Sequence, residues 1–470
     1  MDISVSSCTR VCEFIISVRV CNERASASYQ LFSTYIPPLS MRHNVIQFNW
    51  PISLFMLTPQ GIRRYHTLAM NNPSFWNNLQ KPIIGLAPMD GVTDAPCRTM
   101  HGLYGRPDVI ITEFTNVEGL WRGSDRIFRD FLYTPVERPI VAQIFGCRPE
   151  YFYRAAHVVC ELGFDGLDIN MGCPAKTVAN KGGGAALIRI PETAKAIIRA
   201  AQQGVQDWAN GQTLEDLEMD PQRIERIRLM NEERVQVWGD HVQTDRRLLP
   251  VSVKTRLGYD SIVITDWVQE LLELQPAVIT IHGRTLVQHY KGEANWDAIA
   301  TAAEIVQKTD TLILGNGDIH NLYEAAQRIH TTGVHGVLIG RATFGNPWLF
   351  RYRDQMKKLF NEHTRATADH LPNIIPSREE RLLMALEHAN VHARLKGEDH
   401  YVEMRKHLGW YLGHFPGAKQ IRNELVRVNS LADVERIIHS ALDNPQAFQN
   451  ETEFLQEAIA DPELDLTCAC

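Results

Sequence analysis

The feature that most constrains the fold of this chain is an alternation of short apolar runs with longer stretches of helical character. The runs are rich in Ile and Val and occupy residues 82–89, 109–114, 140–146, 166–174, 251–258, 278–284, 312–319 and 336–344. Such alternation is typical of parallel strands joined by crossover helices. Eight parallel strands in roughly 260 residues match a closed (β/α)8 TIM barrel, whereas an open doubly wound sheet usually has fewer strands. We therefore predict an α/β chain with a TIM barrel over residues 80–350.

Beyond residue 350 the apolar runs stop and helical spacing takes over. Ser377 is placed as a helix N-cap, and Glu380 three residues later completes a capping box. Further helical patterns cover residues 402–412 and 419–428, with a Pro416-Gly417 turn between them. We predict a smaller all-helical domain over residues 375–450 and a frayed acidic tail at 451–470.

Two segments depart from this plan. Residues 1–69 are rich in Ser and Arg, contain few acidic residues and show no sustained helix or strand periodicity. They are interpreted as an organelle transit peptide, a disordered tail, or a stretch that precedes a true start at Met70. Residues 203–249 form a charge-rich connection inside the barrel, which we expect to be a solvated insertion with one or two helices. A partner-docking role is the alternative.

The composition is that of an ordinary globular protein, with a formal net charge of -7 and 44% hydrophobic residues. It excludes disorder as the main state and a uniformly basic nucleic-acid coat, although a local basic patch stays open. Nine scattered cysteines do not make a secreted disulfide scaffold. No run reaches the roughly 18 apolar residues of a membrane span. We expect a cytoplasmic monomer with reduced thiols and no membrane partner.

Glycine-rich turns follow the last two predicted strands, as Gly315-Asn316-Gly317-Asp318 and Gly340-Arg341. Barrels often bind a phosphate at this position, because glycines let backbone N–H groups approach an anion closely. Arg341 would add a charged, forked contact. Tight turns alone explain either pair, but two such turns on adjacent final strands favour a phosphate site.

Four polar residues fall near the carboxyl ends of the third to sixth runs, namely Gln143, Asn170, Lys254 and His282. A lysine that points into a barrel needs an acceptor, since an unpaired buried ammonium is costly. Each residue alone is more often a satisfied polar group of the core. Their shared location favours a flat heteroaromatic cofactor with carbonyls and ring nitrogens, of which a flavin is the natural case.

Cys173 differs from the other cysteines because Gly172 and Pro174 hold it in an exposed turn at the rim of the fourth strand. A thiol placed there suits a nucleophile or a general acid. No CxxC pair or histidine cluster with zinc spacing accompanies it, so we expect no metal site.

A basic patch lies in the predicted helical domain. Between residues 404 and 428 the net charge is +4, from Arg405, Lys406, Lys419, Arg422 and Arg427 against Glu424. Trp410, Tyr411 and Phe415 are interleaved, which suits phosphate contacts and base stacking on RNA. The alternative is a helix pair that packs its aromatic residues inward and leaves its charges outside.

Taken together, these segments resemble the tRNA-dihydrouridine synthases. The resemblance rests on residues 86–94 (LAPMDGVTD), 168–174 (DINMGCP), 254–258 (KTRLG), 282–285 (HGRT), 315–318 (GNGD) and 340–341 (GR). Residues 405–411 (RKHLGWY) and 416–418 (PGA) look like the helical tRNA-binding domain of the bacterial B-type branch. The likeness covers about residues 80–430. Residues 1–69 have no family counterpart and the 203–249 connection is longer than usual, but neither touches a motif.

The resemblance implies an FMN enzyme, an oxidoreductase acting on a CH–CH group, that uses NADPH to reduce the C5–C6 double bond of D-loop uridines in tRNA. Hydride would pass from FMN N5 to C6, and Cys173 would give the proton to C5. The flavin ring would lie against Pro88, Met89, Asp90, Gln143, Lys254 and His282, and its phosphate against Asn316, Gly317, Asp318, Gly340 and Arg341. The implied substrate contacts are Asn170, Arg284, Arg405, Lys406, Lys419 and Arg422.

Three other functions stay open at this stage. An FMN-dependent reductase of a free pyrimidine or enone has no use for a basic helical domain, so deleting residues 375–470 would then leave activity unchanged. The protein could instead be an RNA-binding factor whose barrel has lost its activity. Such a factor would not contain a bound flavin whose absorbance falls when NADPH is added. A phosphate-sugar aldolase or isomerase rests on fold-level analogy alone.

Overall fold

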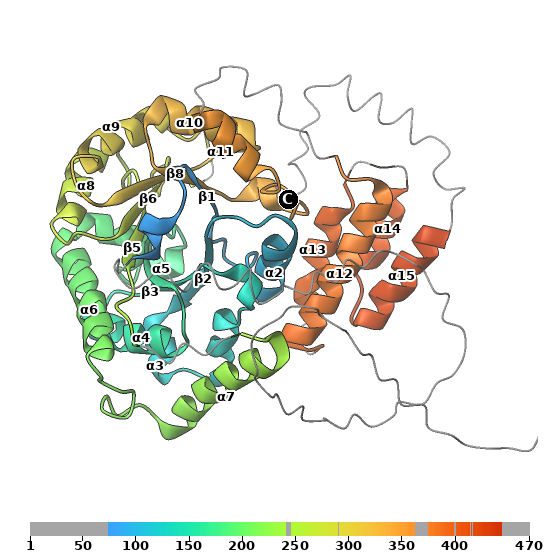
Figure 1. Cartoon of the computed structure of the whole chain (residues 1–470), viewed down its shortest axis with the longest axis horizontal. Coiled ribbons are helices and arrows are strands. Elements are labelled where there is room, and N and C mark those ends of the chain that lie inside the picture. The colour runs from blue at the N-terminus through green and yellow to red at the C-terminus, as the bar shows by residue number, and fades with distance from the viewer. Residues whose placement is uncertain are drawn as a thin grey trace, which may run out of the picture. The chain divides into compact units, whose positions relative to one another are not determined.

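The computed structural model describes residues 74–240, 246–289, 291–361, 375–398, 401–413, 415 and 417–443. Within them, eight parallel strands pair in sequence order, and the last pairs with the first to close a barrel. Figure 1 shows the strands at the centre of a ring of helices. The strands are β1 (Ile83–Leu86), β2 (Ile110–Asn116), β3 (Ile140–Phe145), β4 (Gly166–Met171), β5 (Val251–Arg256), β6 (Val278–His282), β7 (Leu312–Asn316) and β8 (Gly336–Ile339). The predicted TIM barrel is confirmed, and the predictions for residues 1–69 and 451–470 fall outside the described residues.

Helices follow the strands as β/α units require. They are α2 (Ala95–Tyr104), α3 (Val117–Arg122), α4 (Pro149–Glu161), α5 (Lys176–Ala179), α6 (Pro191–Ala209), α7 (Pro221–Trp238), α8 (Ile264–Leu272), α9 (Trp296–Val306), α10 (Leu322–Thr332), α11 (Arg353–Asn361), α12 (Arg378–Lys396), α13 (Met404–Tyr411), α14 (Ala418–Leu425) and α15 (Leu431–Asp443). Short 3-10 helices are η2 (Phe75–Asn78), η3 (Asp125–Phe131), η4 (Pro135–Glu137), η5 (Gly184–Arg189), η6 (Arg341–Thr343) and η8 (Tyr401–Glu403). Within the described ranges, no helix combines the length and apolar character needed to cross a membrane.

Seven strands are shorter than the predicted runs, because polar or glycine-rich turns begin before the run ends, whereas β2 continues two residues past its run to Asn116. The eighth run was expected to extend to residue 344, but β8 ends at Ile339. Gly340 leaves the extended conformation with φ -110° and ψ -103°, and η6 begins at Arg341. The turns that follow the strands lie at the carboxyl ends of the barrel strands, where barrel enzymes form their sites.

Trp76 fills the interior of the barrel at the amino-terminal ends of the strands. It lies on η2, is 1% exposed, and shares a buried cluster with Ile83, Val109 and Leu312, which stand where strands begin. The opposite end of the barrel is left to polar side chains.

The insertion expected at residues 203–249 contributes α7, whose charged residues partly face inward. Arg223 donates to the carbonyl of Leu120 at 2.5 Å, near the end of α3. Asn231 and Arg234 donate to the carbonyls of Glu161 and Leu162 at 2.9 and 3.1 Å, at the end of α4. Carbonyls at a helix carboxyl terminus lack partners within the helix. Helix α7 therefore supports the outer layer of the barrel by capping two of its helices.

The helices α12 to α15, orange to red in Figure 1, form a second hydrophobic core. Ser377 caps α12, and its reciprocal pairing with Glu380 confirms the predicted capping box. Met100 and Trp348, from the barrel part of the chain, pack into this same core. The smaller all-helical part predicted after the barrel is thus present.

A buried ion pair holds the loop between β1 and α2. Arg98 Nε lies 2.7 Å from Glu137 Oε2, and both side chains are 0% exposed. Arg98 also donates to the carbonyl of Thr93 at 2.7 Å. This loop carries Pro88, Met89 and Asp90, three of the residues assigned to the cofactor.

We expect Arg98→Met to lower the free energy of unfolding by about 3–5 kcal/mol, because it leaves the Glu137 carboxylate buried without its partner. Ser377→Ala, which removes only the cap of α12, should cost about 1 kcal/mol. Urea denaturation of both variants measures the difference. Equal, small losses would show that the ion pair does not hold this part of the barrel.

Candidate active site

The carboxyl ends of β3 to β7 bring together the polar residues singled out in the sequence. Strand register places Gln143 beside Asp168 and Asn170 beside Lys254. His282 of β6 pairs with Asn316 of β7. Gln143 is fully buried and Asn170 is 7% exposed. These side chains therefore form one ring at the mouth of the barrel.

Lys254 has an acceptor inside the ring, as its position in a barrel strand requires. Its Nζ lies 3.2 Å from Asn316 Oδ1, and Asn316 in turn donates to the carbonyl of Leu338 at 2.9 Å. Burial lowers the pKa of Lys254 to about 8, the charge of Arg256 acts in the same direction, and Asp168 opposes both. Lys254 is therefore mostly protonated at pH 7 and loses its proton as the pH rises through about 8.

His282 is held in the neutral form. Burial lowers the pKa of its imidazole well below the ordinary value of 6.5, and the positive charges of Arg256 and Lys254 lower it further. A neutral imidazole has one N–H donor and one acceptor, so it can hydrogen-bond a cofactor without adding charge.

Cys173 stands on the loop that follows β4, and its backbone is fixed by Asn170. The Asn170 Oδ1 accepts from the N–H of Gly172 at 3.0 Å and from that of Cys173 at 2.8 Å. The expected exposed turn is wrong for this residue, since Cys173 is 5% exposed. Burial raises the pKa of the thiol above its ordinary value of 9.0, and Asp90 raises it further, while the N–H of Ala175 opposes them. The thiol is therefore protonated at neutral pH.

The glycine turns after β7 and β8 meet around Asp318. Arg284 donates to Asp318 Oδ2 at 2.6 Å, and Arg341 to Asp318 Oδ1 at 2.7 Å. Arg284 is 3% exposed and also bonds the carbonyl of Gly292, whereas half of the Arg341 side chain is exposed. Of these two guanidinium groups, that of Arg341 is the more exposed to solvent.

Gly340 lies where the backbone approaches the β1–α2 loop. A Cβ at this position would stand 3.2 Å from Met89 Sδ. The absence of a side chain lets this turn approach the loop that carries Pro88, Met89 and Asp90. Backbone N–H groups of such a glycine turn can bind phosphate oxygens.

The basic residues of the helical part are mostly engaged in holding it together. Arg405 donates to the carbonyl of Val428 at 2.9 Å, Arg422 contacts the carbonyl of Leu412, and Lys406 contacts that of Gly91 in the β1–α2 loop. Lys419 is exposed on α14.

The aromatic residues of this patch do not offer the base-stacking surface that the sequence suggested. Tyr411 and Phe415 are buried, and Trp410 stacks on Phe344 with ring centroids 4.3 Å apart. The prediction of stacking on RNA is therefore wrong for Tyr411 and Phe415, because their rings fill the core of the helical part.

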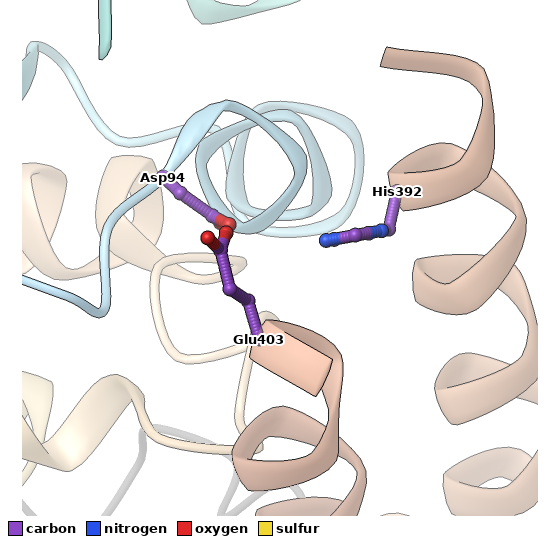
Figure 2. Close-up of side chains that lie close together, drawn as sticks. All are labelled: Asp94, His392 and Glu403. Carbon is purple, nitrogen blue, oxygen red and sulfur yellow. The ribbon is translucent and has the colours of Figure 1, made fainter. Parts of the chain in front are cut away.

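Two carboxylates and an imidazole meet where the β1–α2 loop faces the helical part. Figure 2 shows Asp94 at the start of α2, Glu403 at the end of η8 and the ring of His392 on α12 turned toward both. Their ligand atoms lie within 4.8 Å of one another. The Lys396 ammonium, however, lies 3.0 Å from Asp94 Oδ2 and contacts Glu403. A cation of the chain's own therefore occupies the position that a metal ion would take.

Three buried residues of the site received no role from the sequence. Asp168 accepts from Gln143 and from Ser252 at 2.7 and 2.6 Å, and Arg256 donates to the carbonyl of Gly172 at 2.7 Å. Asp168 and Asn170 are two residues apart on one strand, so they share a face. That spacing was a signal for Asp168, whereas the contact of Arg256 with the Cys173 loop depends on tertiary structure alone.

Comparison with known proteins shows which family this chain is similar to. The model of the dihydrouridine synthase family matches residues 85–210 and 232–453. A probable tRNA-dihydrouridine synthase 2 of Bacillus subtilis (strain 168) is 32% identical over 372 residues, covering 78% of this chain and 95% of the relative. A probable tRNA-dihydrouridine synthase 1 of Synechocystis sp. is 29% identical over 402 residues, covering 83% and 96%.

Among solved structures, an old yellow enzyme homologue from Zymomonas mobilis is similar with a TM-score of 0.34 and 16% identity. The similarity covers 64% of this chain and all of that one. The family model spans both the barrel and the helices after it, and includes every residue of the ring described above. The chain therefore belongs to the dihydrouridine synthase family and is an oxidoreductase.

Proposed function

We propose that this protein is an FMN-dependent tRNA-dihydrouridine synthase of the bacterial B-type branch. It uses NADPH to reduce the C5–C6 double bond of uridines in the tRNA D-loop. Family membership supports the reaction, and the RKHLGWY and PGA stretches of the helical part support the branch. The single observation that carries the proposal is the placement of Cys173 on the loop after β4, where Asn170 holds its backbone beside a ring of amide, imidazole and ammonium groups.

The residues of the ring fit a flavin. Lys254, Gln143 and His282 offer a cation, an amide and a neutral imidazole to carbonyls and ring nitrogens, and buried donors of this kind need such acceptors. Arg341 and the turns at Gly317 and Gly340 would hold the phosphate, with Asn316 and Asp318 bracing those turns. Pro88, Met89 and Asp90 would complete the wall from the β1–α2 loop.

The chain's own residues then have distinct chemical tasks. A bound FMN supplies hydride to C6 of the uracil. The Cys173 thiol gives its proton to C5, where negative charge develops as C6 is reduced. The Lys254 ammonium would help to hold the cofactor and would supply a positive charge to it. The Asn170 Nδ2 group carries two hydrogens and donates one of them to Gln143 Oε1 at 2.9 Å, so the second can donate to a uracil carbonyl.

A base that is stacked within folded tRNA must leave its stack to reach this site. The tRNA needs a second contact that holds it during this step, and we assign this contact to the helical part that follows the barrel. Lys419 lies exposed on α14. The groove between α14 and α15 is lined by Arg427 and Arg436 but also by Glu424 and Asp433, so its charges cancel. We assign phosphate contacts to Lys419, and bracing to Arg405, Lys406, Arg422 and Arg284.

The direct test of the function is nucleoside mass spectrometry of tRNA from a strain that lacks this protein, mapped to position. The proposal expects dihydrouridine to disappear from defined D-loop positions and to return when the gene is restored. Unchanged dihydrouridine at every position, in a strain without a second synthase, would contradict the proposal.

We expect Cys173→Ala to bind FMN and to bleach with NADPH at the wild-type rate, but to form dihydrouridine at least about 100-fold more slowly, as loss of a general acid does. Stopped-flow absorbance follows the flavin, and mass spectrometry of the tRNA follows the product. Full turnover by this variant would exclude Cys173 as the proton donor.

The raised pKa of Cys173 predicts the pH dependence of its alkylation. Only the thiolate reacts with iodoacetamide, so the rate should rise about tenfold per pH unit from neutral pH and should not level off below pH 9. Peptide mass spectrometry of the flavin-free protein reports the rate. A plateau near pH 7 would mean that the residue is a thiolate, which would suit a nucleophile and not an acid.

Lys419→Met should weaken tRNA binding and lower the dependence of log affinity on log salt by about 1, as loss of one phosphate contact predicts. The free energy of unfolding should not change, because the side chain is exposed. Filter binding at several salt concentrations measures the slope. An unchanged slope would remove Lys419 from the tRNA interface.

A further inference from the structure

Two loops that line the proposed flavin site meet where the barrel closes. The loop after β1 carries Met89 and Asp90, and the turn after β8 carries Gly340 and Arg341. Because β1 pairs with β8, the loops are neighbours, and a Cβ at Gly340 would stand only 3.2 Å from Met89 Sδ. Loops are more mobile than the elements they connect, so a site built on two of them needs contacts that hold them in place.

Helix α13 of the helical part contacts both loops through one of its faces. Lys406 and Trp410 are four residues apart on α13, and residues at this spacing lie on the same side of a helix. The Lys406 ammonium contacts the carbonyl of Gly91, which follows Asp90 directly. The Trp410 ring stacks on Phe344, at the end of the turn after β8, with ring centroids 4.3 Å apart and ring planes 16° apart. One face of one helix therefore joins the two loops.

The contact of α13 with the turn after β8 is so close that it requires a glycine. Gly345 has φ +59°, in the left-handed region, and a Cβ there would stand 2.5 Å from the carbonyl carbon of Trp410 and 2.9 Å from the backbone nitrogen of Tyr411. Backbone atoms cannot move aside as a flexible side chain can, so any side chain at Gly345 would displace α13. The ring of His407 packs edge-on against Trp410, with centroids 5.0 Å apart, and helps to hold the indole in place.

The loop after β1 is linked to the helical part at a second point. The Lys396 ammonium of α12 lies 3.0 Å from Asp94 Oδ2, and both side chains are 10% exposed. Asp94 also caps α2, because its Oδ1 accepts from the N–H of Cys97 at 3.1 Å. An ion pair thus fixes the end of this loop, whereas Lys406 acts on its middle, next to Asp90.

We propose that α13 positions these two loops for the cofactor, so that the helical part contributes to FMN binding before any tRNA is present. This inference rests on the proposed function, in which both loops line the flavin. Lys406 and Trp410 are then positioning residues. They need not touch FMN, but without them the loops must be ordered when FMN binds, which weakens binding. The helical part thus has two tasks, one toward the cofactor and one toward the tRNA.

The test measures FMN binding by the full-length flavin-free protein in the absence of tRNA. Lys406→Met removes the ammonium and keeps an unbranched side chain, and Trp410→Leu removes the stacked ring. Each should raise the Kd for FMN about 3- to 10-fold, because only the fraction of molecules with both loops in place binds the cofactor. Titration followed by the change in FMN fluorescence gives this Kd.

Conservative variants separate the two contacts from a general effect of substitution. Lys406→Arg keeps a donor for the carbonyl of Gly91, and Trp410→Phe keeps a ring that can stack on Phe344. Both should bind FMN nearly as tightly as the wild type does.

Matched controls come from the outer helices of the barrel. Lys308→Met removes an exposed ammonium from α9, and Phe360→Leu removes from α11 a half-buried ring that packs on His330 with centroids 6.4 Å apart. Neither control should change the Kd for FMN, although Phe360→Leu should lower the free energy of unfolding as Trp410→Leu does.

Hydrogen exchange of the flavin-free protein supplies a readout that does not depend on the cofactor. Peptides that cover residues 88–93 should exchange faster in Lys406→Met than in the wild type, and peptides that cover residues 340–345 should exchange faster in Trp410→Leu. Peptides of β3 and β4 should be unchanged. If the wild type binds no FMN, the proposed function fails, and these exchange rates still decide whether α13 holds the loops.

Three results would overturn the inference. If the Kd for FMN stays at the wild-type value in both Lys406→Met and Trp410→Leu, the helical part serves the tRNA alone. If Phe360→Leu weakens FMN binding as much as these variants do, the effect is a general loss of stability. If neither loop exchanges faster, α13 does not hold them. Should Trp410→Leu fail to fold, Lys406→Met decides, because its side chain is exposed.

Discussion

Closure of the barrel is the constraint on which the site depends. Parallel pairing of β8 with β1, from Ile83 beside Gly336 to Leu86 beside Ile339, brings the carboxyl ends of all eight strands to one end of the barrel. Residues more than 170 positions apart in the chain, such as Gln143 and Asn316, then belong to the same ring. The interior at the other end is filled by apolar side chains around Trp76, so polar groups gather at the carboxyl ends.

Burial of these polar groups explains their chemistry. Removing charge from water favours the neutral forms of Lys254, His282 and Cys173, and it lowers the first two pKa values while raising the third. Burial also makes unpaired donors and acceptors costly, which is why Gln143, Asn170 and Asp168 bond one another in a fixed order. Burial thus keeps the Cys173 thiol protonated and also fixes the loop that carries Cys173.

Much of this architecture could be predicted from the sequence, because strand runs, capping residues and glycine turns leave local patterns. Ser377 with Glu380 signalled the start of α12, and the runs rich in Ile and Val signalled every strand. The burial of Cys173 was missed, since a Gly-Cys-Pro turn reads as exposed unless the loop that folds over it is known. The engagement of Arg284, Arg405 and Arg422 with backbone carbonyls was missed for the same reason: a basic residue in sequence does not reveal its partner. The inward packing of Tyr411 and Phe415 likewise depends on contacts with distant helices.

We propose that this barrel, with FMN bound, delivers hydride and a thiol proton to uridine in tRNA. The most direct measurement incubates the purified full-length protein with FMN, NADPH and unmodified tRNA transcripts, and then determines nucleoside masses by position. We expect uridines heavier by two hydrogen atoms at defined D-loop positions, formed only when Cys173 keeps its thiol. Flavin that NADPH reduces, in an enzyme that leaves every uridine unchanged, would contradict it.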